Sequence, residues 1–98
     1  MYTIKELPGF TDWLGGIKDR PTRLRLRRRL EKAQNGNLGN VEPVGEGVTE
    51  MKEFFGPGWR MYFVKRGTCL IIMLGGGDKS TQSKDIADAI ALARLLED

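Results

Sequence analysis

No histidine occurs among the 98 residues, and Cys69 is the single cysteine. Histidine is the commonest general base near neutral pH and the commonest metal ligand, so its absence argues against a zinc site and the usual acid–base chemistry. One cysteine cannot form an internal disulfide, which is typical of proteins of a reducing compartment. With no histidine to activate it, Cys69 is expected to be a small core residue and not a nucleophile.

The chain also lacks a signal-peptide pattern and any apolar run long enough to span a membrane, so we expect a cytoplasmic protein. Its length is that of one domain, taken as residues 1–98. The formal net charge is +3, which favours an anionic partner without identifying it.

Apolar periodicity and turn residues predict an α+β fold. A glycine- and asparagine-rich loop over residues 35–47 separates a helical hairpin from a three-strand antiparallel meander. Together with a short N-terminal strand, the meander forms a small antiparallel sheet, and we expect all the helices to pack on one of its faces. The expected order is strand 2–5, helix 10–18, helix 22–34, strands within 48–55, 59–64 and 69–74, and helix 84–96.

The stretch 70–86 is the most informative one. An apolar run over residues 70–74 reads as a buried strand, and three glycines (75–77) are expected to end it and turn the chain. Asp78, Lys79 and further polar residues follow, which suits a binding edge. A phosphate-binding P-loop is excluded because Asp78, not glycine, precedes Lys79. The last helix is expected to be capped by Ser83 or Asp85.

Alternation along the strands places Arg60 and Tyr62 on one sheet face, opposite Met61 and Phe63. With the aromatic-rich face against the helices, Arg60 and Tyr62 lie on an open face with Glu50 and Lys52. Lys79 and Lys84 join this face from the end of the last strand. Cations that hold phosphates and a ring that stacks on a base suit RNA, whereas the alternative is an ordinary solvated sheet face.

Helix 22–34 and the residues before it carry a second cationic cluster, opposed by Glu31 alone. Leu24, Leu26 and Leu30 are expected to face the core. The cluster suits an RNA backbone, with Arg23, Arg27 and Arg28 as predicted contacts, or an acidic protein partner. The alternative is a helix face that serves solubility. The cluster comprises Arg20, Arg23, Arg25, Arg27, Arg28, Arg29 and Lys32.

Three segments together resemble the HigB-like branch of the RelE/ParE toxins, also called addiction module killer proteins. They are residues 50–52 (EMK), 56–63 (GPGWRMYF) and 74–86 (LGGGDKSTQSKDI). The resemblance extends over nearly the whole chain and implies the toxin of a bacterial type II toxin–antitoxin pair. It implies a metal-independent endoribonuclease with no cofactor that cleaves messenger RNA on the translating ribosome. A helix-turn-helix antitoxin would neutralise it, and operator DNA would be reached only through that antitoxin.

The resemblance carries a catalytic role to Arg60, Lys79 and Lys52, in that order of match. Arg60 would hold the scissile phosphate in a bidentate contact, and Lys79 or Lys52 would act as base or acid. Tyr62 would stack on a base, and Lys84 would bind RNA beside it. Many relatives use a histidine or tyrosine near the C-terminus for proton transfer, and this chain has neither after Tyr62.

Two other functions share this fold. The first is a toxin that inhibits gyrase by protein binding, without RNA chemistry. The second is a non-catalytic binding module that acts with its antitoxin in repression of their operon.

Overall fold

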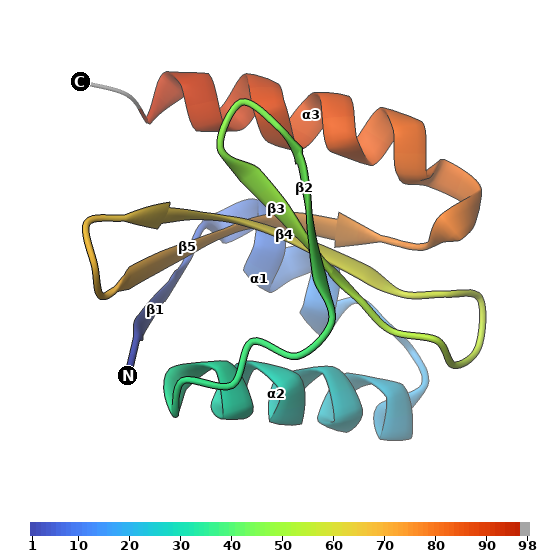
Figure 1. Ribbon diagram of the computed structural model, residues 1–98. Coiled ribbons are helices and arrows are strands. Elements are labelled where there is room, and N and C mark those ends of the chain that lie inside the picture. The colour runs from blue at the N-terminus through green and yellow to red at the C-terminus, as the bar shows by residue number, and fades with distance from the viewer. Residues whose placement is uncertain (97–98) are drawn as a thin grey trace.

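The computed structural model describes residues 1–96 and has an α+β architecture with five strands in one mixed sheet (Figure 1). The predicted single domain, residues 1–98, includes two residues outside this range. Along the chain the elements are β1 (Thr3–Glu6), α1 (Pro8–Gly15), α2 (Arg20–Gln34), β2 (Val41–Gly45), β3 (Val48–Lys52), β4 (Arg60–Arg66), β5 (Leu70–Gly77), the short 3₁₀ helix η1 (Lys79–Thr81) and α3 (Gln82–Leu95).

The sheet order is β1-β5-β4-β3-β2. The predicted meander β3–β4–β5 is confirmed, with each strand antiparallel to the next. The sheet as a whole is not purely antiparallel, because β1 pairs with β5 in parallel. A parallel pair needs a long crossover, and α1 through β4 supply it.

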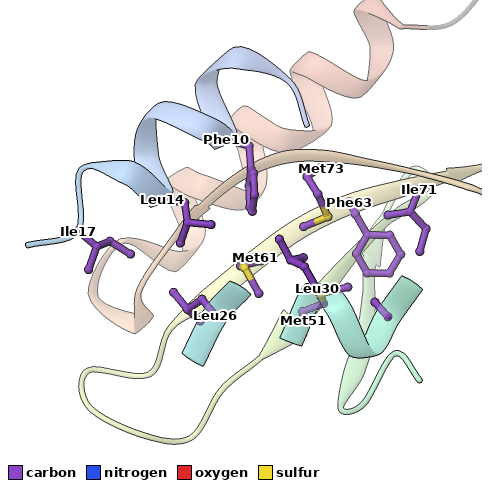
Figure 2. Packing of buried hydrophobic residues seen from close by; sticks show 11 residues of the cluster. Phe10, Leu14, Ile17, Leu26, Leu30, Met51, Met61, Phe63, Ile71 and Met73 are labelled. Carbon is purple, nitrogen blue, oxygen red and sulfur yellow. The ribbon is translucent and has the colours of Figure 1, made fainter. Parts of the chain in front are cut away.

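Helices cover both faces of the sheet, so the expectation that they all pack on one face is wrong (Figure 1). On one face α1 and α2 bury Phe10, Leu14, Leu26 and Leu30 against Met61 and its neighbours (Figure 2). On the other face α3 packs Ala89 and Ala93 against Tyr62, Val64, Ile72 and Leu74. Five consecutive residues of β4 are buried, as a strand covered on both sides requires.

Helix α2 begins at Arg20, two residues before the predicted range 22–34. Asp19 is the N-cap, and its carboxylate accepts hydrogen bonds from the Thr22 backbone N–H (3.2 Å) and hydroxyl (2.6 Å). Pro21 occupies the first turn, where its missing N–H does no harm. Leu26 and Leu30 face the core, but Leu24, which was expected to join them, is 45% exposed.

Strand β2 lies within residues 35–47, which the sequence predicted as a loop. It is one of the two edge strands, and within residues 1–96 it pairs with β3 alone. Pro43, which has no backbone N–H, therefore does not interrupt an interior strand. A register irregularity between Pro43 and Gly45 shortens the regular pairing. An edge strand of five residues that includes a proline and a glycine carries a weak sequence signal, which explains why the sequence did not predict it.

Strand β5 continues through Gly77, so the three glycines do not turn the chain as predicted. Gly75, Gly76 and Gly77 pair with Tyr62, Met61 and Arg60 of β4. The last two allow close packing: a Cβ on Gly76 would lie 2.4 Å from the Trp13 ring, and one on Gly77 would lie 1.9 Å from Asp85 Oδ2. Glycine is present here because neighbours approach the backbone closely.

Helix α3 begins two residues earlier than predicted and ends within one residue of the predicted end. It starts at Gln82 after η1, and Thr81 precedes it, so Ser83 and Asp85 lie inside the helix instead of capping it. Near the C-terminal end Leu96 packs against the core and Leu95 is 80% exposed. Cys69 is also exposed, contrary to the expected core position. Within the described residues no helix is long and apolar enough to cross a membrane.

Candidate functional site

Three cations gather at one edge of the meander, where β3 and β5 end and β4 begins, as the sequence predicts. Lys52 of β3 pairs in register with Arg60 of β4, and Arg60 pairs with Gly77 of β5. Lys79 follows two residues later, in η1. Gly58 lies between the last two: a Cβ there would be 3.4 Å from Lys79 Cβ and 3.8 Å from an Arg60 guanidinium nitrogen. The side chains of Lys79 and Arg60 therefore flank the same glycine turn.

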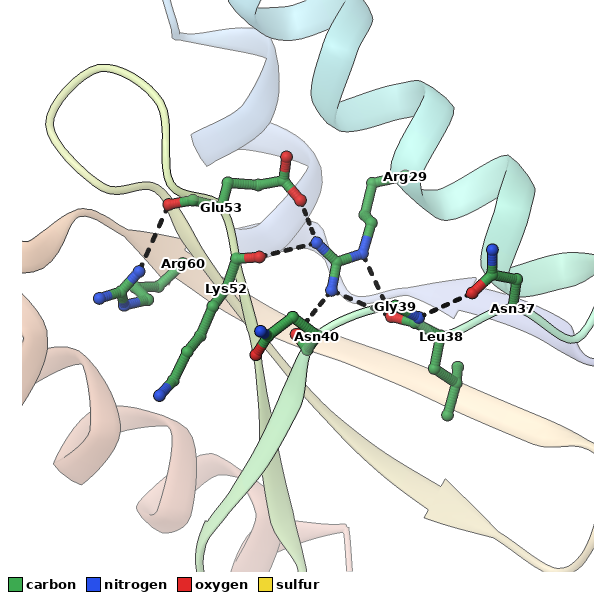
Figure 3. Close-up of polar contacts among 8 residues, drawn as sticks. All are labelled: Arg29, Asn37, Leu38, Gly39, Asn40, Lys52, Glu53 and Arg60. Atoms are coloured by element: carbon green, nitrogen blue, oxygen red, sulfur yellow. Dashed lines mark hydrogen bonds and ion pairs between the residues drawn. The ribbon is translucent and has the colours of Figure 1, made fainter.

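Arg60 is largely buried, with 8% of its surface exposed. Its Nε lies 3.8 Å from Glu50 Oε1, within ion-pair range but beyond a hydrogen bond. One terminal nitrogen donates to the Glu53 carbonyl at 3.5 Å (Figure 3). Its Nε finds no hydrogen-bond acceptor within residues 1–96. Arg60 thus has one N–H donor that no acceptor of residues 1–96 satisfies, and that nitrogen is itself buried.

Glu50 and Gln82 belong to this site although the sequence assigned them no role. The Glu50 carboxylate is 1% exposed and accepts a 2.9 Å hydrogen bond from Gln82 Nε2. Gln82 is the first residue of α3, so the start of α3 is tied to the middle of the sheet. Two signals could have found this pair. Glu50 lies two residues from the buried Val48, on the same face of β3, and Gln82 lies within the 74–86 segment. A buried carboxylate needs a cation close by, and Arg60 supplies it.

Tyr62 is fully buried, so its predicted position on an open face is wrong. The alternation itself is right, since Tyr62 and Arg60 share a face, but α3 covers that face over Tyr62. The ring therefore offers no surface for a base to stack on. Burial raises the pKa of the Tyr62 hydroxyl above its ordinary value, and the negative charge of Glu50 raises it further.

Lys52 forms an ion pair with Glu42 of the edge strand β2. The hydrogen bond and the charge of Lys52 lower the pKa of the Glu42 carboxyl. Glu42 is exposed, so this pair competes with water and with any anion that reaches Lys52.

Lys79 is exposed, and its ammonium contacts no carboxylate of residues 1–96. The neighbouring Asp78 is turned back into η1, where its carboxylate accepts hydrogen bonds from the Ser80 backbone N–H (2.8 Å) and hydroxyl. These bonds lower the pKa of Asp78. Lys79 is therefore the cation of the site that is most available to a ligand.

The other predicted RNA contacts are dispersed. Lys84 lies on the exposed side of α3 and pairs with Asp88 at 2.6 Å, and this hydrogen bond raises the pKa of Lys84. On α2, Arg23 donates to the Ile17 carbonyl at 2.6 Å and Arg27 pairs with Glu6. Arg28 is exposed, with no carboxylate of residues 1–96 in ion-pair contact.

Arg29 is a structural member of the cationic cluster. It is 9% exposed and donates to the carbonyls of Leu38 (3.0 Å), Asn40 (2.7 Å) and Lys52 (2.8 Å), and to the Glu53 carboxylate (Figure 3). Gly39 has φ +68°, and a Cβ there would lie 2.9 Å from Arg29 Nε, so glycine is needed in this turn. Arg29 thereby fixes the entrance to β2 and the end of β3.

The site as a whole can bind an oxyanion. Lys79 and Arg60 supply charge and N–H donors beside one turn, and Lys52 adds charge on the adjacent strand. Within residues 1–96 no three histidine, cysteine, aspartate or glutamate side chains are grouped as metal ligands.

Fold and site define a small α+β protein with a cationic cluster at one end of its meander. The chain is 38% identical over 93 residues to an uncharacterized protein of Haemophilus influenzae, covering 95% of this chain and 94% of the relative. The chain belongs to the same family as that protein. No family model matches the chain, and no solved structure matches it either.

Proposed function

We propose that this protein is the toxin of a bacterial type II toxin–antitoxin system and cleaves messenger RNA on the translating ribosome. The observation that carries the proposal is the grouping of Lys52, Arg60 and Lys79 at the ends of three adjacent strands. These are the cations that the resemblance to HigB-like toxins marks as catalytic.

The chemistry is transesterification within the RNA. The 2′-oxygen attacks the adjacent phosphorus, the bond to the 5′-oxygen breaks, and a 2′,3′-cyclic phosphate and a 5′-hydroxyl result. Lys79 and Arg60 stabilise the negative charge that grows on the phosphate oxygens. The proton leaving the 2′-hydroxyl and the proton gained by the 5′-oxygen pass through Lys79 or Lys52.

Glu50 and Gln82 act as positioning residues in this scheme. Glu50 holds the Arg60 guanidinium from one side at 3.8 Å, and Gln82 holds Glu50 at 2.9 Å. An arginine fixed before the substrate arrives loses less conformational freedom when it binds a phosphate.

A helix-turn-helix antitoxin is the proposed protein partner, and operator DNA is reached through it. Because the proposed RNA substrate is anionic, the net charge of +3 is consistent with that contact.

Lys79→Ala is the most direct test of the proposal. Lys79 is exposed, so its removal leaves no buried partner unpaired. Lys18→Ala removes an exposed lysine from the α1–α2 connection and is the matched control. Primer extension on a message in a purified translation reaction should show new cuts with wild type and Lys18→Ala, and at least tenfold fewer with Lys79→Ala.

The same reaction without ribosomes separates the alternatives. Cuts that need ribosomes support the full proposal, and cuts on naked RNA keep the nuclease but remove the ribosome. If wild type produces no cuts in either reaction, the nuclease proposal fails, and inhibition of gyrase becomes the next assay.

A further inference from the structure

A hollow of about 320 Å³ lies between α2 and the segment that follows β3. Its lining includes Arg25, Arg29, Asn40, Glu53, Phe54 and Phe55. Lys52 also borders it, and the Lys52 carbonyl is bound by Arg29 while its side chain extends away from Arg29 (Figure 3). The hollow thus adjoins the cationic site through a residue that belongs to both.

Two phenylalanine rings line this hollow. Phe54 is 76% exposed, and Phe55 lies under the guanidinium of Arg25, whose Cζ is 3.9 Å from the ring centroid. Bases of single-stranded RNA stack on exposed aromatic rings and on arginine planes, whatever their sequence. An exposed ring beside a stacked arginine offers such a surface, which the buried Tyr62 does not.

The charge around the hollow favours a polyanion. Arg25, Arg28 and Lys32 occupy positions i, i+3 and i+7 of α2, so they share one helix face. None of them contacts a carboxylate of residues 1–96. They line a second hollow of about 430 Å³, which shares Arg25, Arg29 and Glu53 with the first.

Among the described residues, Glu53 is the one carboxylate that lines the two hollows, and its ion pair with Arg29 balances its charge. Arg29 also fixes the Asn40 and Lys52 carbonyls, so the walls of the first hollow are held in place before any ligand binds. A preformed site loses less freedom on binding.

We infer that these hollows bind single-stranded RNA next to the cleavage site, with a base on Phe54 and the backbone along Arg25, Arg28 and Lys32. The inference rests on the proposed function, since it identifies where the RNA substrate continues beyond the scissile phosphate. An acidic peptide is the other occupant that the charge would accept, and the experiment below includes it.

Binding is measured with a fluorescent single-stranded RNA whose 2′-O-methyl groups block cleavage. Phe54→Ala should weaken binding about tenfold, as expected for the loss of one base-stacking contact. Phe54→Tyr should bind like wild type. Leu24→Ala removes an exposed apolar side chain of α2 and should also bind like wild type.

The salt dependence of binding tests whether the RNA backbone lies along Arg25, Arg28 and Lys32. For a single strand, each phosphate contact contributes about 0.7 to the slope of log affinity against log salt. The slope is negative, and Lys32→Ala should make it less steep by about 0.7, whereas Lys18→Ala should leave it unchanged.

The outcomes separate this inference from the proposed function. RNA binding that is weakened by Phe54→Ala supports the inference even if wild type cuts no message. Wild-type cleavage with unaltered binding by Phe54→Ala overturns the inference and leaves the nuclease. Absence of RNA binding by wild type also overturns it. The acidic occupant is tested with a poly-glutamate peptide, and a Phe54→Ala variant that loses peptide binding but keeps RNA binding likewise overturns the inference.

Discussion

Arg60 serves both the fold and the proposed site, and this dual role changes how it can be tested. Glu50 is 1% exposed, and within residues 1–96 the Arg60 guanidinium is its counter-charge. Arg60→Ala would leave that carboxylate buried without a cation. Removing one partner of a buried ion pair is strongly destabilising. We therefore expect the free energy of unfolding to fall by about 3 kcal/mol in urea denaturation.

The double variant Arg60→Met with Glu50→Gln is the control for this expectation. It removes both charges and keeps similar volumes, so it should recover most of the lost stability. An Arg60→Ala variant as stable as wild type would show that the pair has no role in folding. Loss of RNA cleavage in Arg60→Ala alone therefore does not identify a catalytic residue.

Tyr62 provides a test by alkaline titration. Its folded-state pKa is raised, so the folded protein keeps the phenolic proton at a pH where the unfolded chain, with an ordinary pKa near 10, begins to lose it. The stabilisation is fully present below pH 10 and is lost as the pH rises above that value.

The measurement uses a Tyr2→Phe background, which leaves Tyr62 as the one tyrosine of the chain. Tyrosinate absorbance should stay low above pH 10 for as long as the protein remains folded and should rise together with unfolding. Ionisation near pH 10 in the folded state would contradict the burial of Tyr62.

Strand β5 is the element whose glycines can be separated by their surroundings. A Cβ on Gly76 would overlap the Trp13 ring at 2.4 Å, whereas one on Gly75 meets nothing within 4 Å. Gly76→Ala should therefore lower the free energy of unfolding by about 1–3 kcal/mol, as overpacked substitutions do. Gly75→Ala should be neutral or slightly stabilising, by up to about 1 kcal/mol.

Both glycine variants are compared by urea denaturation. If both variants were as stable as wild type, Trp13 would not approach the strand as described. A Gly75→Ala variant as unstable as Gly76→Ala would instead point to a conformation of β5 that requires glycine at every position.

At the level of elements, the sequence predicts what local patterns specify. Helix α2 has a capping aspartate, a proline in its first turn and apolar periodicity, and the meander has clear turns. The second covered face is predictable in principle from the same patterns, because the five buried residues of β4 and the apolar run of β5 are typical of strands buried on both sides. β2 is not, since its pairing with β3 depends on contacts beyond its own sequence.

In the candidate site, too, local sequence patterns predict some features, whereas others depend on contacts between elements. Alternation and strand order bring Lys52, Arg60 and Lys79 together, which sequence reasoning anticipated. The engagement of Arg23, Arg27 and Arg29 with partners of their own chain could not be anticipated, because those partners lie in other elements or turns. Arg28 is the predicted α2 contact that remains available to a ligand.

For the molecule as a whole, the proposed catalytic cations lie at one end of the meander, and the proposed RNA-binding surface runs along the exposed side of α2. Both features act on the same polyanion. Removing Lys79 should therefore reduce cutting at least tenfold while the Phe54 stacking contact remains, and removing Phe54 should weaken RNA binding while the catalytic cations remain.

The most direct measurement of the central claim is the chemistry of the RNA ends that the protein produces on a translated message. The account predicts new 5′-hydroxyl ends, which polynucleotide kinase labels without prior phosphatase treatment, from wild type and Lys18→Ala but not from Lys79→Ala. Equal labelling with Lys79→Ala, or new ends that carry 5′-phosphate, would contradict it.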